Sequence, residues 1–477
     1  MLTEDRFSRR WVIQELALAQ TATVHCGKHV CLWSEFQKAL TTFARNFDVL
    51  KPKLVRYFES TQLGRDNWNH DSVLKINHLG ATLLVEMTTN LFRYSGKGLR
   101  QSNIGLERLV CSLSGFDTSD PRDTINAFRS MCKELNRPDS VTARQVPAPD
   151  YGKDLFEVYR DFVRWVISTS QRLNILCRFY ALKERQTRGP TTPRLVDLPS
   201  WIQYVEDSAW GKAGDTFNGR RAGDSFVGLP DDHTYYASGE GIEYRLPVVC
   251  FPPSPIQIEQ MGPTGMRTLS FVKHDTSLLV RGVAIGQVTF RTDAMEGVII
   301  RECLKRLGWS FDRSATTVAE VPDQLWKTLV ADRDSNGKLP PTWYKTACED
   351  VLKYCSNNGQ INIDNILRAP CYKSTIWKSE VPPYLERVKA VTFNRSFIES
   401  ASNHGEDKLV GFAPDKTEAG DVIAILFGCS VPVILRPTYN SADDVEEYQF
   451  VGESYIYGKM SGETFDEDHE EKNFRLI

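Results

Sequence analysis

Residues 6–27 read RFSRRWVIQELALAQTATVHCG, and this stretch decides how the fold at the start of the chain is predicted. Its first half places apolar side chains on nearly every face of a helix, which is typical of a buried helix. Short apolar runs on both sides of Gly27 predict a β-hairpin over residues 23–32. Ser34 and Gln37 then have the spacing of a capping box, which predicts a second helix directly after the hairpin.

Two polar residues, Gln14 and Glu15, lie within the apolar surface of the first helix. A buried amide and a buried carboxylate need hydrogen-bond partners, and Arg9 and Arg10 are the nearest candidates. A buried helix followed by strands is typical of the interior of an α/β layer, yet only five residues precede Arg6. We therefore expect the sequence to begin inside a domain.

The run Phe7–Ala19, with Val24–Gly27 behind it, resembles the last of three sequence blocks in the fungal heterokaryon incompatibility (HET) domain. The positions that carry this family motif are Arg10, Trp11, Gln14, Glu15, Cys26 and Gly27. The two earlier blocks of the family, Ser-Tyr-x-Trp-Gly and Ile-Asp-x-x-Cys-Ile-Asn-Gln, do not occur in this sequence. The resemblance implies that residues 1–48 are the C-terminal remnant of a HET domain, a truncated α/β unit similar to the TIR fold.

Weaker landmarks that follow the HET domain in similar proteins extend the resemblance along most of the chain. They are Thr118–Asp123, Asp150–Tyr151, Leu198–Trp201, Trp326–Arg333, Gly420–Ile423 and Val451–Gly458. The resemblance implies a role in fungal non-self recognition and in the programmed cell death that it triggers. Some TIR-like proteins cleave NAD, so the resemblance also implies an alternative in which this chain is an NAD-cleaving enzyme.

Composition limits the classes of partner. The chain has 477 residues, 41% of them hydrophobic and 25% charged, which is ordinary for a globular protein of about three domains. A net charge of -3 provides no long-range attraction to nucleic acid or to an anionic membrane. The longest nearly apolar run, residues 422–435, contains Gly428 and Pro432 and is too short to span a bilayer. Eleven cysteines without a CxxC pair favour reduced thiols and a cytoplasmic location.

Apolar periodicity divides the rest of the chain into helical and strand-rich parts. Positions three and four apart predict a helical bundle over residues 49–182, with long helices at 72–94 and 154–181. Residues 183–225 begin with a polar, proline-bearing stretch and predict a linker.

Two later tracts, residues 226–294 and 401–460, show the alternation and turn signals of short strands. An isolated short sheet is marginal in water, so we predict that the two tracts pair into one small β-barrel or sandwich. Residues 295–400 would then be a helical insertion, and the acidic residues 461–477 a disordered tail. The predicted fold class is α+β.

Glu15 is the candidate catalytic residue. A carboxylate whose pKa is raised by an apolar setting is suited to general acid–base work, and NAD would be its substrate under the enzymatic alternative. A structural anion held by Arg9 or Arg10 is the favoured interpretation, because structural ion pairs also shift pKa values. No other cofactor is predicted.

Two further patterns resemble metal sites and are explained better as structure. Four potential zinc ligands gather in the hairpin: His25, Cys26, His29 and Cys31. Alternate residues of a strand point to opposite faces, so a tetrahedral set is hard to close and no metal site is predicted. Asp332–Gly337 copies the first half of an EF-hand loop, but Trp343 takes the place of the required glutamate, so a turn is predicted. Asp120 and Asp123 are similarly assigned to helix capping.

We therefore expect a protein that acts by interaction rather than by catalysis. The predicted contact is with a protein partner or a second copy, made through the apolar N-terminal helix, where apolar surface around Trp11, Val12 and Leu16 should be exposed. No nucleic acid and no membrane span are predicted.

Overall fold

The structure is a computed structural model, and its described residues fall in many segments of the chain. They are residues 9–19, 21–46, 50, 53, 85, 92–94, 100–136, 146–183, 198–208, 225–230, 232–240, 245–252, 259–261, 267–269, 275–309, 320–353, 359–368, 380–402, 408–440, 445–466 and 469–477. Unit 1 comprises Met1–Trp165, Phe179–Leu195 and Tyr204–Gly223. Unit 2 comprises Val166–Arg178, Val196–Gln203 and Asp224–Ile477. The boundary expected at residue 48 falls within unit 1.

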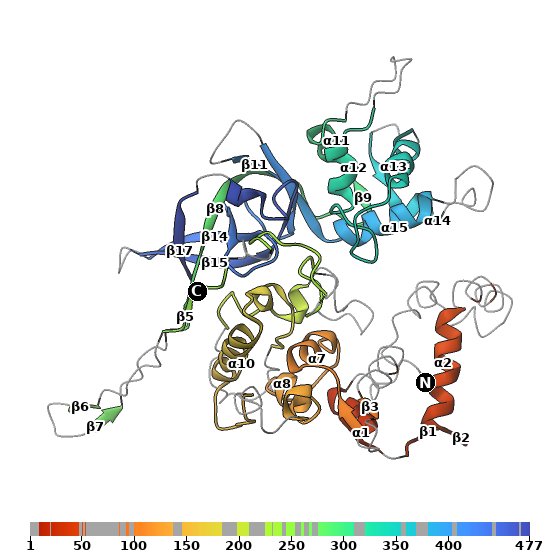
Figure 1. Cartoon of the computed structure of the whole chain (residues 1–477), viewed down its shortest axis with the longest axis vertical. Coiled ribbons are helices and arrows are strands. Elements are labelled where there is room, and N and C mark those ends of the chain that lie inside the picture. The colour runs from red at the N-terminus through yellow and green to blue at the C-terminus, as the bar shows by residue number, and fades with distance from the viewer. Residues whose placement is uncertain are drawn as a thin grey trace. The chain divides into compact units, whose positions relative to one another are not determined.

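Unit 1 is mostly helical (Figure 1). Its described elements are α1 (Arg10–Leu18), β1 (Thr23–Cys26), β2 (His29–Leu32), α2 (Trp33–Arg45), β3 (Phe92–Tyr94), β4 (Arg100–Ser102), α7 (Leu106–Ser112), α8 (Asp123–Arg129), a 3₁₀ turn at Lys133–Asn136, most of α10 (Leu155–Ser170) and a 3₁₀ turn at Val205–Asp207. Helices α1 and α8 pack together, as do α7 and α8. On α10, Tyr159 and Phe162 are wholly buried and pack against Tyr180, with ring centroids 5.8 and 5.5 Å away.

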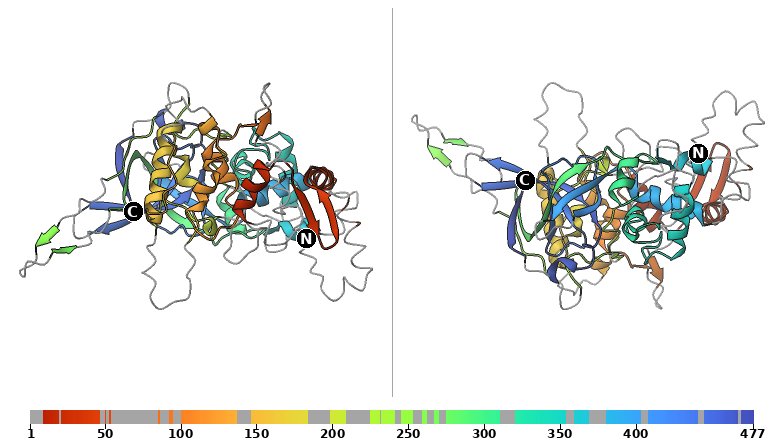
Figure 2. Two further views of the ribbon diagram at one scale, coloured as in Figure 1. Left: turned by 90° about the horizontal axis from the view of Figure 1, so that it is seen from below. Right: turned by 90° about the horizontal axis from the view of Figure 1, so that it is seen from above.

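The predicted hairpin and the helix after it are confirmed. Strands β1 and β2 are antiparallel, and Gly27 adopts φ +57° in the tight turn between them, a conformation that glycine enters without steric cost. Helix α2 packs against both strands, buries Trp33 and Leu40, and lies beside the hairpin in both views of Figure 2. Val24 is the buried residue of β1, so one face of the hairpin is covered.

The prediction of an all-helical region over residues 49–182 is wrong in two places. A helix is predicted over residues 72–94, but residues 92–94 pair with residues 100–102 as the β3–β4 hairpin. Most of the range 72–94 lies outside the described residues. The helix predicted at 154–181 ends at Ser170, because Gln171 adopts φ +55°, and a separate 3₁₀ turn follows at Asn174–Cys177.

Unit 2 is built on a nine-stranded sheet. Its strands are β5 (Val249–Cys250), β8 (Leu278–Arg291), β11 (Arg395–Ser402), β12 (Lys408–Pro414), β13 (Val422–Leu426), β14 (Val433–Asn440), β15 (Val445–Glu453), β16 (Tyr455–Ile456) and β17 (Glu471–Leu476). Strands β15 and β17 are parallel, and the other pairs in this sheet are antiparallel. Figure 1 shows the green β8 among the blue C-terminal strands.

The two strand-rich tracts share this one sheet, as expected. Strand β8 comes from the first tract and pairs with β13 of the second. It also pairs with β11, which lies almost wholly in the predicted insertion, and with β17, which lies in the predicted tail, so the predicted bounds of the second tract are too narrow. The pairing order β8, β13, β14, β15, β17 returns to β8, so these five strands form a closed circuit of ladders. A closed circuit leaves fewer strand edges open for pairing with other chains.

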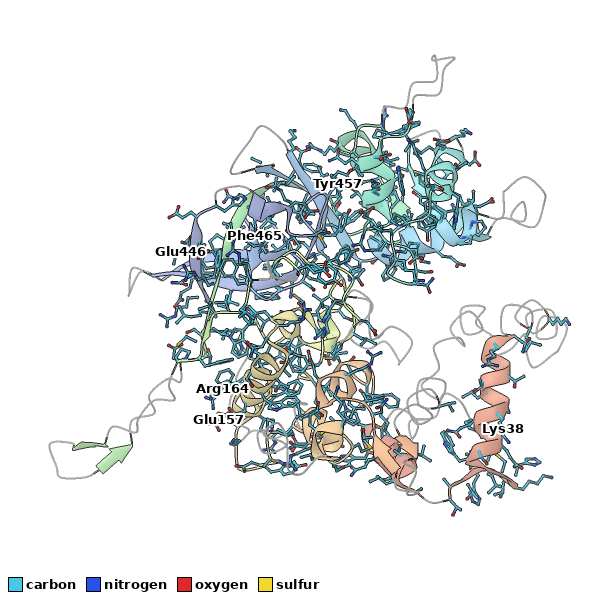
Figure 3. All side chains as sticks on the ribbon, viewed as in Figure 1. Lys38, Glu157, Arg164, Glu446, Tyr457 and Phe465 are labelled. Atoms are coloured by element: carbon cyan, nitrogen blue, oxygen red, sulfur yellow. The ribbon has the colours of Figure 1, made fainter. Side chains whose placement is uncertain are left out.

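Apolar residues from β8, β11, β13, β14 and the following strands form the core of the sheet. This group of buried side chains includes Val283, Ile285, Ile398, Ile423 and Ile434. Phe465, labelled in Figure 3, packs against this group, and its ring centroid lies 6.0 Å from that of Phe427. Strand β13 is buried from Ile423 to Leu426 and is paired on both edges, with β8 and β14, so it is a central strand of the sheet.

The described residues between β8 and β11 are mostly helical, as predicted. It contains α11 (Arg301–Arg306), α12 (Asp323–Leu329), α13 (Trp343–Lys353), α14 (Ile363–Arg368) and α15 (Val381–Thr392), together with the short pair β9 (Val298–Ile299) and β10 (Ile361–Asn362). Helices α13 and α15 pack through the rings of Tyr344 and Tyr384, whose centroids are 5.4 Å apart. A separate hairpin is formed by β6 (Glu259–Met261) and β7 (Arg267–Leu269). Among the described helices, none has the length and apolar character needed to cross a membrane.

Three sequence-based predictions for unit 2 are wrong. The tail predicted to be disordered contains a 3₁₀ turn at Glu463–Asp466 and strand β17, because Phe474 and Leu476 alternate with charged residues and become fully buried. The predicted linker contains the buried Trp201 and Ile202. The first strand-rich tract is predicted to begin at residue 226, but residues 235–237 within it form no strand, although Tyr235 and Ala237 are buried.

Gly411 of β12 tests the closeness of the sheet packing. A Cβ atom at this position would overlap the backbone carbonyl group of Tyr455 in β16. We expect Gly411→Ala to lower the free energy of unfolding of unit 2 by about 1–3 kcal/mol, because backbone cannot move aside as a flexible side chain can. Thermal unfolding of the full chain measures this.

The matched control is Gly458→Asn. Gly458 has φ +72°, a Cβ atom added there would have no neighbour within 4 Å, and asparagine tolerates this left-handed conformation. Equal melting temperatures for Gly411→Ala and the wild type would contradict the close approach of β12 and β16.

Candidate functional site

Helix α1 is anchored to unit 1 by Arg10, whose side chain is wholly buried. Its guanidinium donates to the carbonyl oxygens of Phe116 (Nη2–O 2.8 Å), Thr124 (Nη1–O 3.1 Å) and Ser114 (Nη2–O 3.4 Å). It also lies 5.3 Å from the centre of the Phe128 ring. Arginine presents five donors in a planar fork, so one side chain holds several backbone carbonyls of the segment between α7 and α8.

Asp123, at the start of α8, collects a second set of contacts. Its Oδ2 accepts hydrogen bonds from Trp11 Nε1 at 3.0 Å and from Thr118 Oγ1 at 3.4 Å, and its Oδ1 accepts one from Tyr151 at 2.6 Å. Burial, together with the hydrogen bond to Asp123, raises the pKa of Tyr151 to about 12. The structure therefore brings together Trp11 of the N-terminal motif and the landmarks Thr118–Asp123 and Asp150–Tyr151.

Asp120 and Arg122 extend this network. Arg122 Nη2 lies 2.8 Å from Asp120 Oδ2, and the side-chain hydrogen bond from Arg122 lowers the pKa of Asp120. Arg122 also donates to the carbonyl oxygens of Tyr151 at 2.7 Å and Lys153 at 3.2 Å, with its guanidinium over the Tyr151 ring. These contacts fix the loop before α10, so the acidic residues have a structural role here. The predicted capping is wrong, because the N-cap residue of α8 is Arg122, which makes no side-chain capping hydrogen bond, and Asp123 lies inside the helix.

The position of Glu15 differs from its prediction. Glu15 is exposed, and Arg10 points into the protein toward carbonyl oxygens, so the expected buried pair of Glu15 with Arg10 is wrong. Gln14 is half-buried and donates to Ser130 Oγ at 2.9 Å. Arg10 turns inward because its guanidinium donates to the carbonyls of Ser114, Phe116 and Thr124, whereas the carboxylate of Glu15 has no donor with which to bind a carbonyl oxygen. An exposed carboxylate lacks the apolar setting that would adapt it for acid–base catalysis.

The remaining motif residues lie in the hairpin. Cys26 is exposed, and the register pairs it with His29, while His25 pairs with Val30 on the opposite face. His25 is thereby separated from the other three potential zinc ligands, as predicted. Within the described residues, no group of three or more His, Cys, Asp or Glu side chains is arranged to hold a metal ion.

A buried ion pair in unit 2 was not singled out from the sequence. Glu453 and Arg395 are 3% and 5% exposed, and Arg395 Nη2 lies 3.2 Å from Glu453 Oε1. Glu453 also accepts hydrogen bonds from Ser225 Oγ and the Phe226 N–H, both at 2.6 Å, and from the Val227 N–H at 3.1 Å. In the sequence, Glu453 is recognisable as a charged residue at the end of a strand-like run. Its partners cannot be found from residue spacing, because they are distant in sequence.

The landmark Trp326–Arg333 ends in an unusual backbone segment. Ala331 and Asp332 have φ values of +52° and +48°, a region that residues other than glycine seldom adopt. Tyr235 donates to the Ala331 carbonyl, and Arg387 donates to the carbonyl of Arg333 at 3.0 Å, so contacts on both sides hold this segment. Burial raises the pKa of Asp332.

Two other landmarks and the EF-hand-like sequence have similar structural roles. Asp421 is buried and is held by Arg436, with Nε–Oδ1 at 2.9 Å. Ser200 accepts the Phe450 N–H at 2.8 Å and donates to the Ile477 carbonyl. Asp334 accepts the N–H groups of residues 336 and 338, which confirms the predicted turn.

Arg10 provides a test of the anchor. We expect Arg10→Ala to lower the free energy of unfolding of unit 1 by about 3 kcal/mol or more, because several buried carbonyls lose their donor. Urea unfolding followed by tryptophan fluorescence measures the change. Arg9→Ala is the matched control: the neighbouring side chain is exposed, and its removal should change stability by less than about 0.5 kcal/mol. Similar losses in both variants would contradict the anchoring role.

Tyr151 gives a pH test. Because its folded pKa is raised to about 12 while an unfolded tyrosine titrates near 10, its contribution to stability is complete below about pH 10 and is lost as pH rises toward 12. Tyr151→Phe should therefore show a smaller loss of unit 1 stability between pH 9 and 12 than the wild type. Urea unfolding across this range is the measurement, with Tyr236→Phe of unit 2 as control, and identical pH profiles would exclude the contribution.

Comparison with known proteins adds one finding. Residues 402–477 match the family model of the Het-6 beta-barrel domain. No curated protein and no solved structure shows a significant match to the chain. The matched range begins at the end of β11 and includes β12 to β17, so it covers most strands of the nine-stranded sheet but not β8. Residues 402–477 are thus similar to the Het-6 beta-barrel domain, a family related to heterokaryon incompatibility.

Proposed function

We propose that this chain is a heterokaryon incompatibility protein that takes part in fungal non-self recognition and in the resulting cell death. The observation that carries the proposal is the match of residues 402–477 to the Het-6 beta-barrel domain. The resemblance of the N-terminal motif to the last HET block agrees with it, because the two signals come from opposite ends of the sequence. Residues 1–48 would be a TIR-like HET remnant, and the protein would act in the cytoplasm.

The proposed mode of action is binding to another protein rather than catalysis. In the described part of the chain, seven large apolar side chains are exposed, and three of them, Leu18, Val30 and Leu32, lie close together in sequence. Val30 and Leu32 are 57% and 48% exposed. The register places them with Thr23 and His25 on the hairpin face opposite the buried Val24. We define the side chains of Val30 and Leu32, which share this face, as the N-terminal apolar surface.

The exposed apolar side chains lie elsewhere than predicted. Trp11, Val12 and Leu16 are only half-exposed, and Trp11 donates a hydrogen bond to Asp123, so these side chains are partly covered by unit 1. The end of α1 and the hairpin are available for contact instead. Apolar side chains on a two-stranded sheet with open edges are suited to binding a protein segment through both side chains and backbone.

Inducible expression in a filamentous fungus tests the proposal. We expect the wild-type chain to slow colony growth and to increase uptake of a cell-death dye. Val30→Asp together with Leu32→Asp should abolish most of this effect, because two charges on the surface oppose burial against a partner. Circular dichroism and thermal unfolding of the purified variant establish that it is folded.

Two controls separate binding from catalysis. Leu339→Asp changes another exposed apolar residue, in unit 2, and should leave the effect intact. Glu15→Gln should also leave it intact, and cellular NAD should be unchanged by the wild type. Loss of the effect in Glu15→Gln together with a fall of NAD in the wild type would replace the binding proposal with the enzymatic one.

A further inference from the structure

Two cysteines far apart in sequence meet inside unit 2. Cys177 and Cys429 are each 1% exposed, and their sulfur atoms lie 3.7 Å apart although 252 residues separate them in the chain. This distance is a van der Waals and hydrogen-bonding contact between two thiols. A disulfide requires an S–S distance of about 2.05 Å, so the sulfurs need to approach by roughly 1.7 Å.

The surrounding backbone holds the two cysteines in place. Cys177 ends the 3₁₀ turn Asn174–Cys177, and Cys429 lies in the turn between β13 and β14. The Leu173 N–H donates to the Gly428 carbonyl at 2.8 Å, and the Ser430 N–H donates to Asn174 Oδ1 at 2.8 Å. The residues flanking each cysteine are thus hydrogen-bonded to residues flanking the other. Closure of the sulfur pair needs side-chain rotation and little movement of the backbone.

The two thiols are also chemically unequal. Burial raises the pKa of Cys177 well above its usual value, whereas the hydrogen bond from Cys177 lowers the pKa of Cys429. Either sulfur can donate in this contact, and the lowered pKa makes the sulfur of Cys429 the better nucleophile. This asymmetry of an attacking and a resolving thiol is typical of cysteine pairs that are oxidised in sequence.

We propose that Cys177 and Cys429 form a reversible disulfide when the protein is exposed to a peroxide. The Cys429 sulfur attacks one peroxide oxygen, the O–O bond breaks, and a sulfenic acid and one water are formed. The Cys177 sulfur then attacks the sulfenic sulfur, the S–O bond breaks, and the thiol proton leaves with the oxygen as a second water. Two thiols lose two electrons in total, and hydrogen peroxide is reduced to two waters.

The bond joins the segment Asn174–Cys177 covalently to the turn after β13. This turn belongs to the range that matches the Het-6 beta-barrel domain, whereas Cys177 lies far outside it. A cross-link across so long a loop restricts the unfolded chain strongly. Oxidation therefore stabilises unit 2 without requiring any change in the sheet.

Peptide mapping of the full-length protein tests the bond directly. The protein is purified in reductant, transferred to reductant-free buffer, treated with hydrogen peroxide, and alkylated to block free thiols. Tryptic digestion without reduction and mass spectrometry should reveal one peptide pair linking Cys177 to Cys429. Dithiothreitol should separate the pair. Absence of this pair, with oxidation found at the exposed Cys26 and Cys250, would overturn the proposal.

Thermal unfolding gives the second measurement. Peroxide should raise the melting temperature of the wild type by about 5–10 °C, and dithiothreitol should reverse the shift. Cys177→Ala should show no shift. Cys303→Ala is the matched control, because Cys303 is another wholly buried thiol of unit 2 and its removal should leave the shift intact. An equal shift in Cys177→Ala would overturn the proposal, and peptide mapping of the wild type decides the matter if that variant does not fold.

Discussion

The two-sided pairing of β8 is the constraint on which unit 2 depends. One edge of β8 pairs with β5 and β13 and the other with β17 and β11, so this strand closes the circuit of ladders. Its glycines make this possible: a side chain at Gly286 would meet Ser400 Oγ and the Ala401 carbonyl at 2.5 and 2.7 Å. Without β8, the edges of β13 and β17 would be open. The family match at residues 402–477 therefore covers strands whose partner lies outside the matched range.

Buried polar residues provide a second kind of constraint. Arg10, Asp421 and Glu453 are each buried, and each binds groups from segments that are distant in sequence. Such residues contribute modest net stability when fully paired, but the loss of one partner leaves a buried group unsatisfied at high cost. They therefore specify which segments meet. The sequence landmarks at Thr118–Asp123, Gly420–Ile423 and Val451–Gly458 each contain such a hydrogen-bonding centre.

The sequence predicted those elements whose apolar pattern is local. The hairpin at residues 23–32, the buried strand β13 and the shared sheet of two tracts followed from periodicity and from the instability of small isolated sheets. The surroundings of Arg10 and Glu15 were predicted wrongly, because helical periodicity does not show which charged residue of a helix contacts carbonyl groups that are distant in sequence. The tail was misassigned because its acidic residues outweighed the alternation of Phe474 and Leu476. The pairs Glu453–Arg395 and Cys177–Cys429 bring together residues with no local pattern to link them.

The order of strands along the chain also affects synthesis on the ribosome. Strand β8 is complete at Arg291, but its partner β17 ends at Leu476, near the last codons of this sequence. At roughly 5–20 residues per second, a ribosome needs about 10–40 s to make the intervening stretch. Strands β11 and β13 are made earlier in that interval, but residues 278–283 of β8 lack their partner on one edge until β17 is made, and contacts of such long range also form slowly. The circuit of ladders can therefore close only after β17 has left the ribosome.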